Sequence, residues 1–320
     1  MDADQCQDSD FKAYRHGTHR TVTPATTLQR AHPHLRAMGI TRIANITGLD
    51  RLGLPVVTVG RPNARSLAVS QGKGLDLDSA KASGVMESVE AYHAEHIDAA
   101  LRCGSLSDLS DSLHLADVSA LPKSAGNRFH EDLRLFWIEG HNRMDGSALW
   151  LPLETVSADY TLPLPPGHGC FAASTNGLAS GNTLEEAVAH GISEVEERDA
   201  VALWKLQGER PRRASAVDID TDDDTLCREA LGYFERAGVQ VKVWDVTSDV
   251  GIATFCCLAY GEEDDWADPE FGAGCHAARE IALLRALTEA AQARTTFIAG
   301  ARDDLGSALY APDARRRRRA

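Results

Sequence analysis

Polar residues recur at helical spacing on three stretches of this 320-residue chain, and most of them are glutamates. The three sets are Ser83, Glu87 and Glu90; Glu186, His190, Glu194 and Glu197; and Arg285, Glu289 and Gln292. Because residues three or four apart lie on one face of a helix, each set forms a single stripe. The sequence therefore predicts three helices that each present polar groups along one side.

Carboxylates on one helical face need compensation when that face is buried, because a buried like-charge pair without a cation or bound protons is strongly destabilising. Glu87 and Glu90 lie in alanine- and valine-rich text without a Lys or Arg four residues on. Magnesium takes carboxylate and phosphate oxygens and would meet the need. Two such ions on a triphosphate would explain why several helices each supply a glutamate, with Arg285 neutralising phosphate charge.

The alternative is a set of ordinary solvated faces on an acidic protein, since the formal net charge is −14. The same acidity argues against a non-specific nucleic-acid binder, which is usually basic. With 43% hydrophobic residues, the chain can bury a large core in one domain or in two closely packed ones. Helix-like and strand-like stretches alternate with glycine and proline turns, so we expect a mixed α/β or α+β fold.

Cysteine usage and the chain's opening residues bear on the compartment. The seven cysteines have irregular spacing and include no CxxC pair, so zinc-site spacing is absent. The first 20 residues are polar and resemble no secretory signal. No run approaches the roughly 18 apolar residues that span a bilayer. We therefore expect a cytoplasmic protein without a membrane partner, with Cys256 and Cys257 in the core.

Periodicity and turn residues predict the order of the elements. Helices are expected over 27–38, 78–102, 184–207, 225–237 and 277–298, and strands within 41–60, 65–70, 133–153, 239–246 and 252–260. Thr183 and Glu186 have capping-box spacing, which marks the start of the third helix. Three prolines make 161–168 a loop. Residues 72–74, Gly-Lys-Gly, are interpreted as a turn.

Familiar nucleotide and metal motifs do not account for the glutamates. The chain contains neither GxxxxGK[ST] nor GxGxxG, and the segment around Lys73 is too short for a phosphate loop. His190 and Glu194 resemble part of a metal motif but lack the second histidine of HExxH. The pattern therefore favours a polar lining role for His190 over a ligand role.

Four stretches of the sequence together resemble the YcaO superfamily. They are GTHRTVTPATTLQRAHPHLRAMGITRIANITGLDRLGLPV, SQGKGLDLDSAKASGVMESVEAYHAE, STNGLASGNTLEEAVAHGISEVEERDA and GAGCHAAREIALLRALTEAAQAR. The resemblance covers about residues 15–303, with the motifs in the family's order. It implies an α+β fold in which mixed or antiparallel sheets pack against the glutamate-bearing helices.

The resemblance also implies an activity, in which ATP and Mg2+ serve to phosphorylate the oxygen of a peptide backbone amide. A nucleophile then attacks the amide carbon, and ADP and phosphate are released. Sulfide gives a thioamide, a Cys, Ser or Thr side chain gives an azoline, and an amine gives an amidine. The GTHR opening resembles members paired with a TfuA-like protein, which favours thioamide formation. An azoline-forming cyclodehydratase, a non-catalytic peptide- or partner-binding domain, and a generic ligase that releases AMP and pyrophosphate are the alternatives.

Site residues follow from the resemblance by position. The expected nucleotide-binding set is Arg20, Thr27, Ser83, Glu87, Glu90, His190, Glu194, Glu197, Arg285, Glu289 and Gln292. Glu87, Glu90, Glu194 and Glu197 are the expected metal ligands, and no residue is assigned to the chemical step. The expected partners are a peptide or protein substrate, a TfuA-like protein and a second copy of the chain, with no nucleic acid.

Three segments are expected along the chain. Residues 1–14 form a flexible lead, residues 15–303 the YcaO domain, and residues 304–320 an irregular tail with five arginines at Arg315–Arg319. Azoline-forming relatives often end in a PxPxP tail, which this sequence lacks. The arginine-rich end is interpreted as a disordered tail or as the mark of a truncation, and the alternative is a basic arm that binds an acidic partner.

Overall fold

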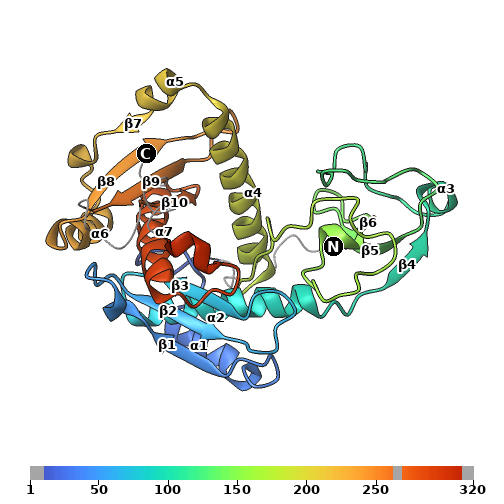
Figure 1. Ribbon diagram of the computed structural model, residues 1–320, viewed down its shortest axis with the longest axis horizontal. Coiled ribbons are helices and arrows are strands. Elements are labelled where there is room, and N and C mark those ends of the chain that lie inside the picture. Colours follow the sequence, from blue (N-terminus) through green and yellow to red (C-terminus); the bar gives the residue numbers. More distant parts are fainter. Residues whose placement is uncertain (1–10, 262–268, 312–320) are drawn as a thin grey trace, which may run out of the picture. The chain divides into compact units, whose positions relative to one another are not determined.

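The computed structural model describes residues 11–261 and 269–311 (Figure 1). These residues form two compact units. The first is built from the described parts of Met1–Asn63, Leu67–Glu90 and Asn176–Ala320, and the second from Ala64–Ser66 and Ala91–Thr175. Antiparallel sheets with helices against them make up the fold, which confirms the predicted α+β class.

The first unit begins with a three-stranded antiparallel sheet in the order β1-β2-β3. Its elements are α1 (Pro24–Ala31), β1 (Arg42–Asn45), β2 (Val56–Gly60), β3 (Val69–Lys73) and α2 (Leu77–Glu95). Val57 and Val59 of β2 are fully buried with Val85 of α2. A Cβ on Gly72 of β3 would lie 2.0 Å from the carbonyl oxygen of Ala80, so glycine is what allows strand and helix to approach this closely.

A second antiparallel sheet in the same unit has the order β10-β9-β8-β7. Its elements are α4 (Leu184–Leu206), α5 (Glu209–Ala214), β7 (Ala216–Val217), α6 (Thr225–Arg236), β8 (Gln240–Asp245), β9 (Thr254–Tyr260), β10 (Glu270–Cys275) and α7 (Arg279–Ala299). Gly272 and Gly274 of β10 let the backbone of α7 lie directly on the sheet. Helix α7 also contacts β3, so it joins the two sheets of this unit.

The second unit is smaller and richer in loops. It contains β4 (Leu101–Gly104), α3 (Leu106–Leu109), β5 (Leu135–His141) and β6 (Ala148–Pro152), with the strands in the order β4-β5-β6. Trp137 and Phe171 are fully buried in its core. Glu154 is also buried, and its carboxylate accepts the backbone N–H groups of three successive residues from Gly169 to Phe171.

Several predicted element boundaries were wrong. The helix over 27–38 gives way after Ala31 to a short 3-10 turn that contains Pro33, because proline has no backbone N–H with which to continue the helical hydrogen bonds. The helix over 78–102 ends at Glu95, and Leu101–Gly104 instead pairs with β5.

The strand predicted at 65–70 lies at Val69–Lys73. Gly72 and Lys73, which were interpreted as a turn, are therefore the last residues of this strand. Strand β10 was not predicted. Both strands owe their place to sheet pairing and close helix contacts that a local pattern does not show.

The places of several other elements are confirmed. Helices α4, α6 and α7 and strands β1, β2, β5, β6, β8 and β9 lie where the periodicity placed them, within a few residues. Cys256 and Cys257 are fully buried. Within the described ranges, no helix combines the length and apolar character needed to cross a bilayer. Residues 1–10 of the expected lead and 312–320 of the arginine-rich tail lie outside the described residues.

Candidate functional site

Strand β3 holds glutamates from two of the three striped helices. The backbone N–H of Gln71 donates to Glu87 Oε2 of α2 over 3.0 Å. Two residues on, Lys73 Nζ lies 2.7 Å from Glu289 Oε2 of α7. The end of this strand therefore connects the first and third predicted stripes.

The segment before α4 holds the second glutamate of α2. Glu90 Oε1 accepts hydrogen bonds from the Ser180 backbone N–H at 2.8 Å and from its hydroxyl at 2.7 Å. The backbone of Gly177 in the same segment hydrogen-bonds Glu194 of α4. This segment therefore links the first and second stripes.

Helix α4 is tied to β10 by its most buried site glutamate. Glu197 Oε2 accepts the backbone N–H of Cys275 over 3.1 Å. Its other oxygen lies 2.9 Å from Arg198 Nη1, and Arg198 Nη2 reaches Glu194 at 3.5 Å. One arginine therefore compensates two carboxylates of α4.

The pKa values of these acids show that their environment disfavours the charged form. Burial raises the pKa of Glu87, Glu90, Glu194 and Glu197. For Glu90 the pKa reaches about 7, with a further contribution from the charges of Glu87 and Glu194. Glu87 keeps solvent-exposed surface, yet the surrounding elements displace enough water to raise its pKa. The hydrogen bonds and basic groups around these four acids therefore do not fully offset the effect of their burial.

Glu289 is the exception among these five acids. Burial, the largest single cause, acts to raise its pKa, but the charge and hydrogen bond of Lys73 together with the charges of Arg198 and Arg285 outweigh it. The net result is a lowered pKa, so Glu289 stays ionised. Its charge in turn raises the pKa of Glu197.

A group of basic side chains lies beside the acids. Arg285 Nη1 donates to the carbonyl oxygen of Cys275 at 3.3 Å, and Nη2 donates to His190 Nδ1 at 3.1 Å, since a guanidinium has no acceptor. Burial, then the charges of Arg285, Arg20 and Lys73, lower the pKa of His190 to about 2. His190 is therefore neutral and carries its proton on Nε2.

The basic group extends to the N-terminal segment. Burial and then the charge of Arg285 lower the pKa of Arg20, while Glu186 and Glu90 oppose the change. The rings of His19 and His276 lie edge to face with centroids 5.1 Å apart. Burial and Arg285 lower the pKa of His276 to about 4. This surplus of positive charge suits an anion with several negative groups.

The remaining predicted residues lie on the same elements with fewer contacts. Asn182 Nδ2 donates to the hydroxyl of buried Thr27 over 3.0 Å. Ser83 is exposed on α2, one turn before Glu87. Gln292 is half-buried on α7. Among the described residues, neither the Ser83 nor the Gln292 side chain makes a hydrogen bond, so both remain available to a ligand.

Glu186 of the second stripe has a structural position. It is almost fully buried, and its carboxylate accepts the backbone N–H groups of Thr21 and Asn182. Burial would raise its pKa, but these bonds and the charge of Arg20 lower it. The Thr183 hydroxyl accepts the Glu186 N–H at 3.3 Å, so half of the predicted capping box forms.

Sequence reasoning missed three contributors to this site. Lys73 was not assigned to the site because residues 72–74 were interpreted as a turn. A lysine between two glycines at the end of a strand can nevertheless reach a helix packed on that strand. Arg198 follows Glu197 directly and lies four residues after Glu194, which is the spacing of a helical ion pair. No sequence pattern indicated Ser180, because its contact partner Glu90 lies 90 residues away in the chain.

The carboxylates fit a magnesium ion that arrives with phosphate. Within the described parts of the chain, no three Asp, Glu, His or Cys side chains already converge as a metal site. The donors that the three helices contribute are carboxylate oxygens, which suit a hard cation. Magnesium usually takes one or two carboxylates and completes its shell with phosphate oxygens and water. The raised pKa values of four acids are what an uncompensated cation site would show.

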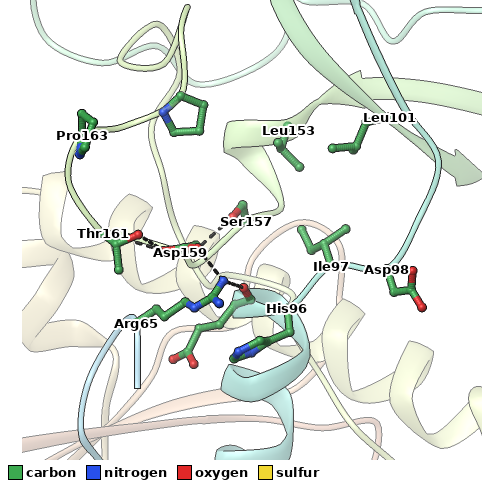
Figure 2. A pocket seen from close by; sticks show the side chains of 12 residues that line it. Arg65, His96, Ile97, Asp98, Leu101, Leu153, Ser157, Asp159, Thr161 and Pro163 are labelled. Atoms are coloured by element: carbon green, nitrogen blue, oxygen red, sulfur yellow. Dashed lines mark hydrogen bonds and ion pairs between the residues drawn. The ribbon is translucent and has the colours of Figure 1, made fainter. Parts of the chain in front are cut away.

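A separate pocket of about 500 Å³ lies in the second unit (Figure 2). Leu101, Leu153 and Pro163 line part of it. Arg65 lies on its polar part, where it bonds to Asp159 Oδ2 at 2.9 Å and to the Glu95 carbonyl oxygen at 3.2 Å. This arginine is therefore held by contacts within the second unit.

A family model and several known proteins match this chain. The family model described as YcaO cyclodehydratase, ATP- and Mg2+-binding, matches residues 71–320. A Rhizobium leguminosarum bv. trifolii relative, known as an uncharacterized protein in the tfuA 3' region, is 37% identical over 298 residues, or 91% of this chain and 70% of the relative.

Two solved structures share the fold. A heterocyclase in complex with substrate and cofactor superposes with a TM-score of 0.72 at 28% identity, over 87% of this chain and 40% of that chain. YcaO from Methanopyrus kandleri, bound with AMPPCP and Mg2+, has a TM-score of 0.64 at 22% identity, over 91% of this chain and 71% of that chain. This protein therefore spans less than half the length of the heterocyclase. By the extent of the sequence match, the chain belongs to the YcaO family.

Proposed function

We propose that the glutamate cluster of α2, α4 and α7 binds ATP with Mg2+ and that the chain uses it to activate a peptide backbone amide. One observation carries the proposal: acids with raised pKa values from α2 and α4 lie beside the basic group of Arg20 and Arg285. A metal–triphosphate offers positive charge to the first group and negative charge to the second.

Individual roles follow from position. Glu87, Glu90, Glu194 and Glu197 hold the metal, because burial raises their pKa values and they lie on the two helices that contribute the glutamate stripes. Arg285 and Arg20 bind phosphate oxygens. His190 presents its Nε2–H as a fixed neutral donor, since Arg285 occupies Nδ1. Ser83, Gln292, Thr27 and Glu289 complete the nucleotide-binding set.

Bound ATP supplies a phosphoryl group that turns the amide oxygen into a leaving group. An amide oxygen is a poor leaving group, so the nucleophile can replace it as phosphate only after this transfer. The site residues orient the nucleotide and stabilise charge that develops on the transferred group. Arg285, Arg20 and the metal ligands therefore act at the start of the reaction.

The nucleophile we favour is sulfide, which gives a thioamide. The support is the relative in the tfuA 3' region, together with the GTHR opening of the resemblance. The heterocyclase of similar fold supports azoline formation as the second candidate. A TfuA-like partner protein and a homodimer belong to the same proposal.

Turnover with defined products tests this function. Purified protein is mixed with Mg2+, ATP, candidate peptides and sulfide, with and without a TfuA-like protein. The expected result is ADP and phosphate, together with a peptide in which sulfur replaces one backbone oxygen. Loss of water from the peptide would assign azoline formation instead. AMP and pyrophosphate, or peptide binding without nucleotide hydrolysis, would contradict the proposed activity.

A further inference from the structure

We propose that Lys73 is the counter-cation of the glutamate cluster, which consists of Glu87, Glu90, Glu194, Glu197 and Glu289. Its ammonium group offsets the charge of these acids when no metal is bound, and it therefore weakens their binding of a metal ion. The inference rests on the proposed function, because it takes the cluster to be the metal site. It adds a role for a residue that the family resemblance did not place in the site.

The backbone holds Lys73 in a fixed place. A Cβ on Gly72 would lie 2.0 Å from the Ala80 carbonyl oxygen, and a Cβ on Gly74 would lie 2.5 Å from the Ser79 Cβ. Both glycines therefore let the end of β3 press against α2. With the strand held in this way, the lysine side chain extends to α7 and meets Glu289 at 2.7 Å.

The ammonium of Lys73 acts on acids from three helices. It makes its short contact with Glu289 of α7, and its charge also stabilises the ionised forms of Glu87 on α2 and Glu197 on α4. A single positive group that faces carboxylates from several elements has the electrostatic role that a bound cation would have.

The other cations nearby have different partners. Arg198 bonds to Glu194 and Glu197, and Arg285 is directed to His190 and the Cys275 carbonyl oxygen. Lys73 is thus the cation that bonds directly to Glu289. Without it, Glu289 and Glu87 would repel more strongly, and the cluster would attract a divalent ion more strongly.

Measuring metal binding in the absence of nucleotide distinguishes a counter-cation role of Lys73 from a role in binding phosphate. Mn2+ alone is titrated into the wild type, Lys73→Met and the control Lys81→Met by calorimetry or electron paramagnetic resonance. Lys81 lies on α2, where it contacts Asp78 at 3.5 Å on the surface. We expect Lys73→Met to bind Mn2+ at least about tenfold more tightly than the wild type. Lys81→Met should match the wild type.

Thermal unfolding gives a second readout. Metal-free Lys73→Met should unfold at a lower temperature than the wild type, and saturating Mn2+ should restore the difference. If Lys73→Met does not fold, Lys73→Met/Glu289→Gln takes its place, because removing both charges should recover the metal-free fold. Failure of the double variant to fold would overturn the proposal.

Mn2+ binding to Lys73→Met that is unchanged or weaker than wild type would overturn the counter-cation role. If Mn2+ alone binds to neither protein, the inference fails, whereas the proposed function, in which the metal arrives with ATP, is decided by titration of ATP with Mg2+. If Lys73→Met binds Mn2+ more tightly but the wild type binds no ATP with Mg2+, the inference stands and the proposed function fails.

Discussion

The two units of this chain bury glutamates in opposite ways. In the second unit, Glu154 is 6% exposed and accepts backbone N–H groups from Gly169, Cys170 and Phe171 at 2.6, 3.1 and 3.0 Å. In the first unit, Glu90 receives two bonds from Ser180 and also faces the charges of Glu87 and Glu194. A carboxylate surrounded by N–H donors stabilises a loop, whereas buried carboxylates that act on one another by charge suit the cation that the proposed function requires.

Glu186 shows that the distinction does not follow the sequence stripes. It belongs to the same helical stripe as Glu194, yet it resembles Glu154 because backbone N–H groups surround it. Hydrogen-bond partners therefore separate structural acids from site acids better than spacing does.

The largest expected effect is on nucleotide affinity. Glu197→Gln should weaken binding of ATP with Mg2+ by on the order of 100-fold, because a charged ligand to a buried cation is lost. Isothermal titration calorimetry measures the change. The matched control is Glu185→Gln, which removes an exposed carboxylate from the same helix. Equal losses in both variants would contradict a local effect.

The second effect should appear in stability alone. Glu154→Gln replaces one carboxylate oxygen with an N–H donor that faces the backbone N–H groups of Gly169 to Phe171. We expect a loss of about 2 kcal/mol in the free energy of unfolding, measured by urea denaturation, with ATP affinity unchanged. A loss of ATP affinity in a fully folded variant would break the comparison between the two units.

The third effect is a pH dependence. Burial raises the folded pKa of Glu90 from 4.5 to about 7, so the folded state binds more protons than the unfolded state between these values. The stability of the metal-free protein should therefore fall as pH rises through this window. Glu90→Gln should gain stability relative to the wild type as pH rises from 4.5 to 7 and should lose this advantage near pH 4.5. Urea denaturation across this range measures it, and an advantage that does not change with pH would contradict the assignment.

The smallest effect concerns Glu289, whose pKa is lowered. Its ionised form stabilises the fold at neutral pH, and this contribution should be lost as pH falls through the lowered pKa. Glu289→Gln should therefore cost about 1 kcal/mol at pH 7 and less in acid. Lys73→Met should show the same pH trend, since it removes the other half of the pair.

The helices that carry the candidate site could be predicted from the sequence. The groups that hydrogen-bond its glutamates could not. Helical spacing placed Glu87, Glu194 and Glu289 on three helices, because this periodicity is local and survives folding. The donors that hold these acids come from strands and loops distant in sequence, such as Gln71, Ser180 and Cys275. No local pattern predicts a backbone N–H that acquires its partner through tertiary packing.

Strand ends were misplaced for the same reason. Lys73 belongs to β3 because Gly72 packs against α2, and Leu101–Gly104 leaves the preceding helix because it pairs with β5. In both cases a contact between elements overrode a local preference. The family resemblance named most of the site residues, but only the contacts showed that Glu186 and Lys73 differ from what the stripe and the turn implied.

Titration of ATP into the wild type and Glu87→Gln, each with and without Mg2+, tests the central claim most directly. The account predicts that Mg2+ strengthens ATP binding to the wild type and that Glu87→Gln loses most of this enhancement. The basic residues should leave a weak, Mg2+-independent affinity in both proteins. A wild type that does not bind ATP, or a Glu87→Gln variant with the full Mg2+ enhancement, would contradict the assignment of the glutamate cluster as the nucleotide and metal site.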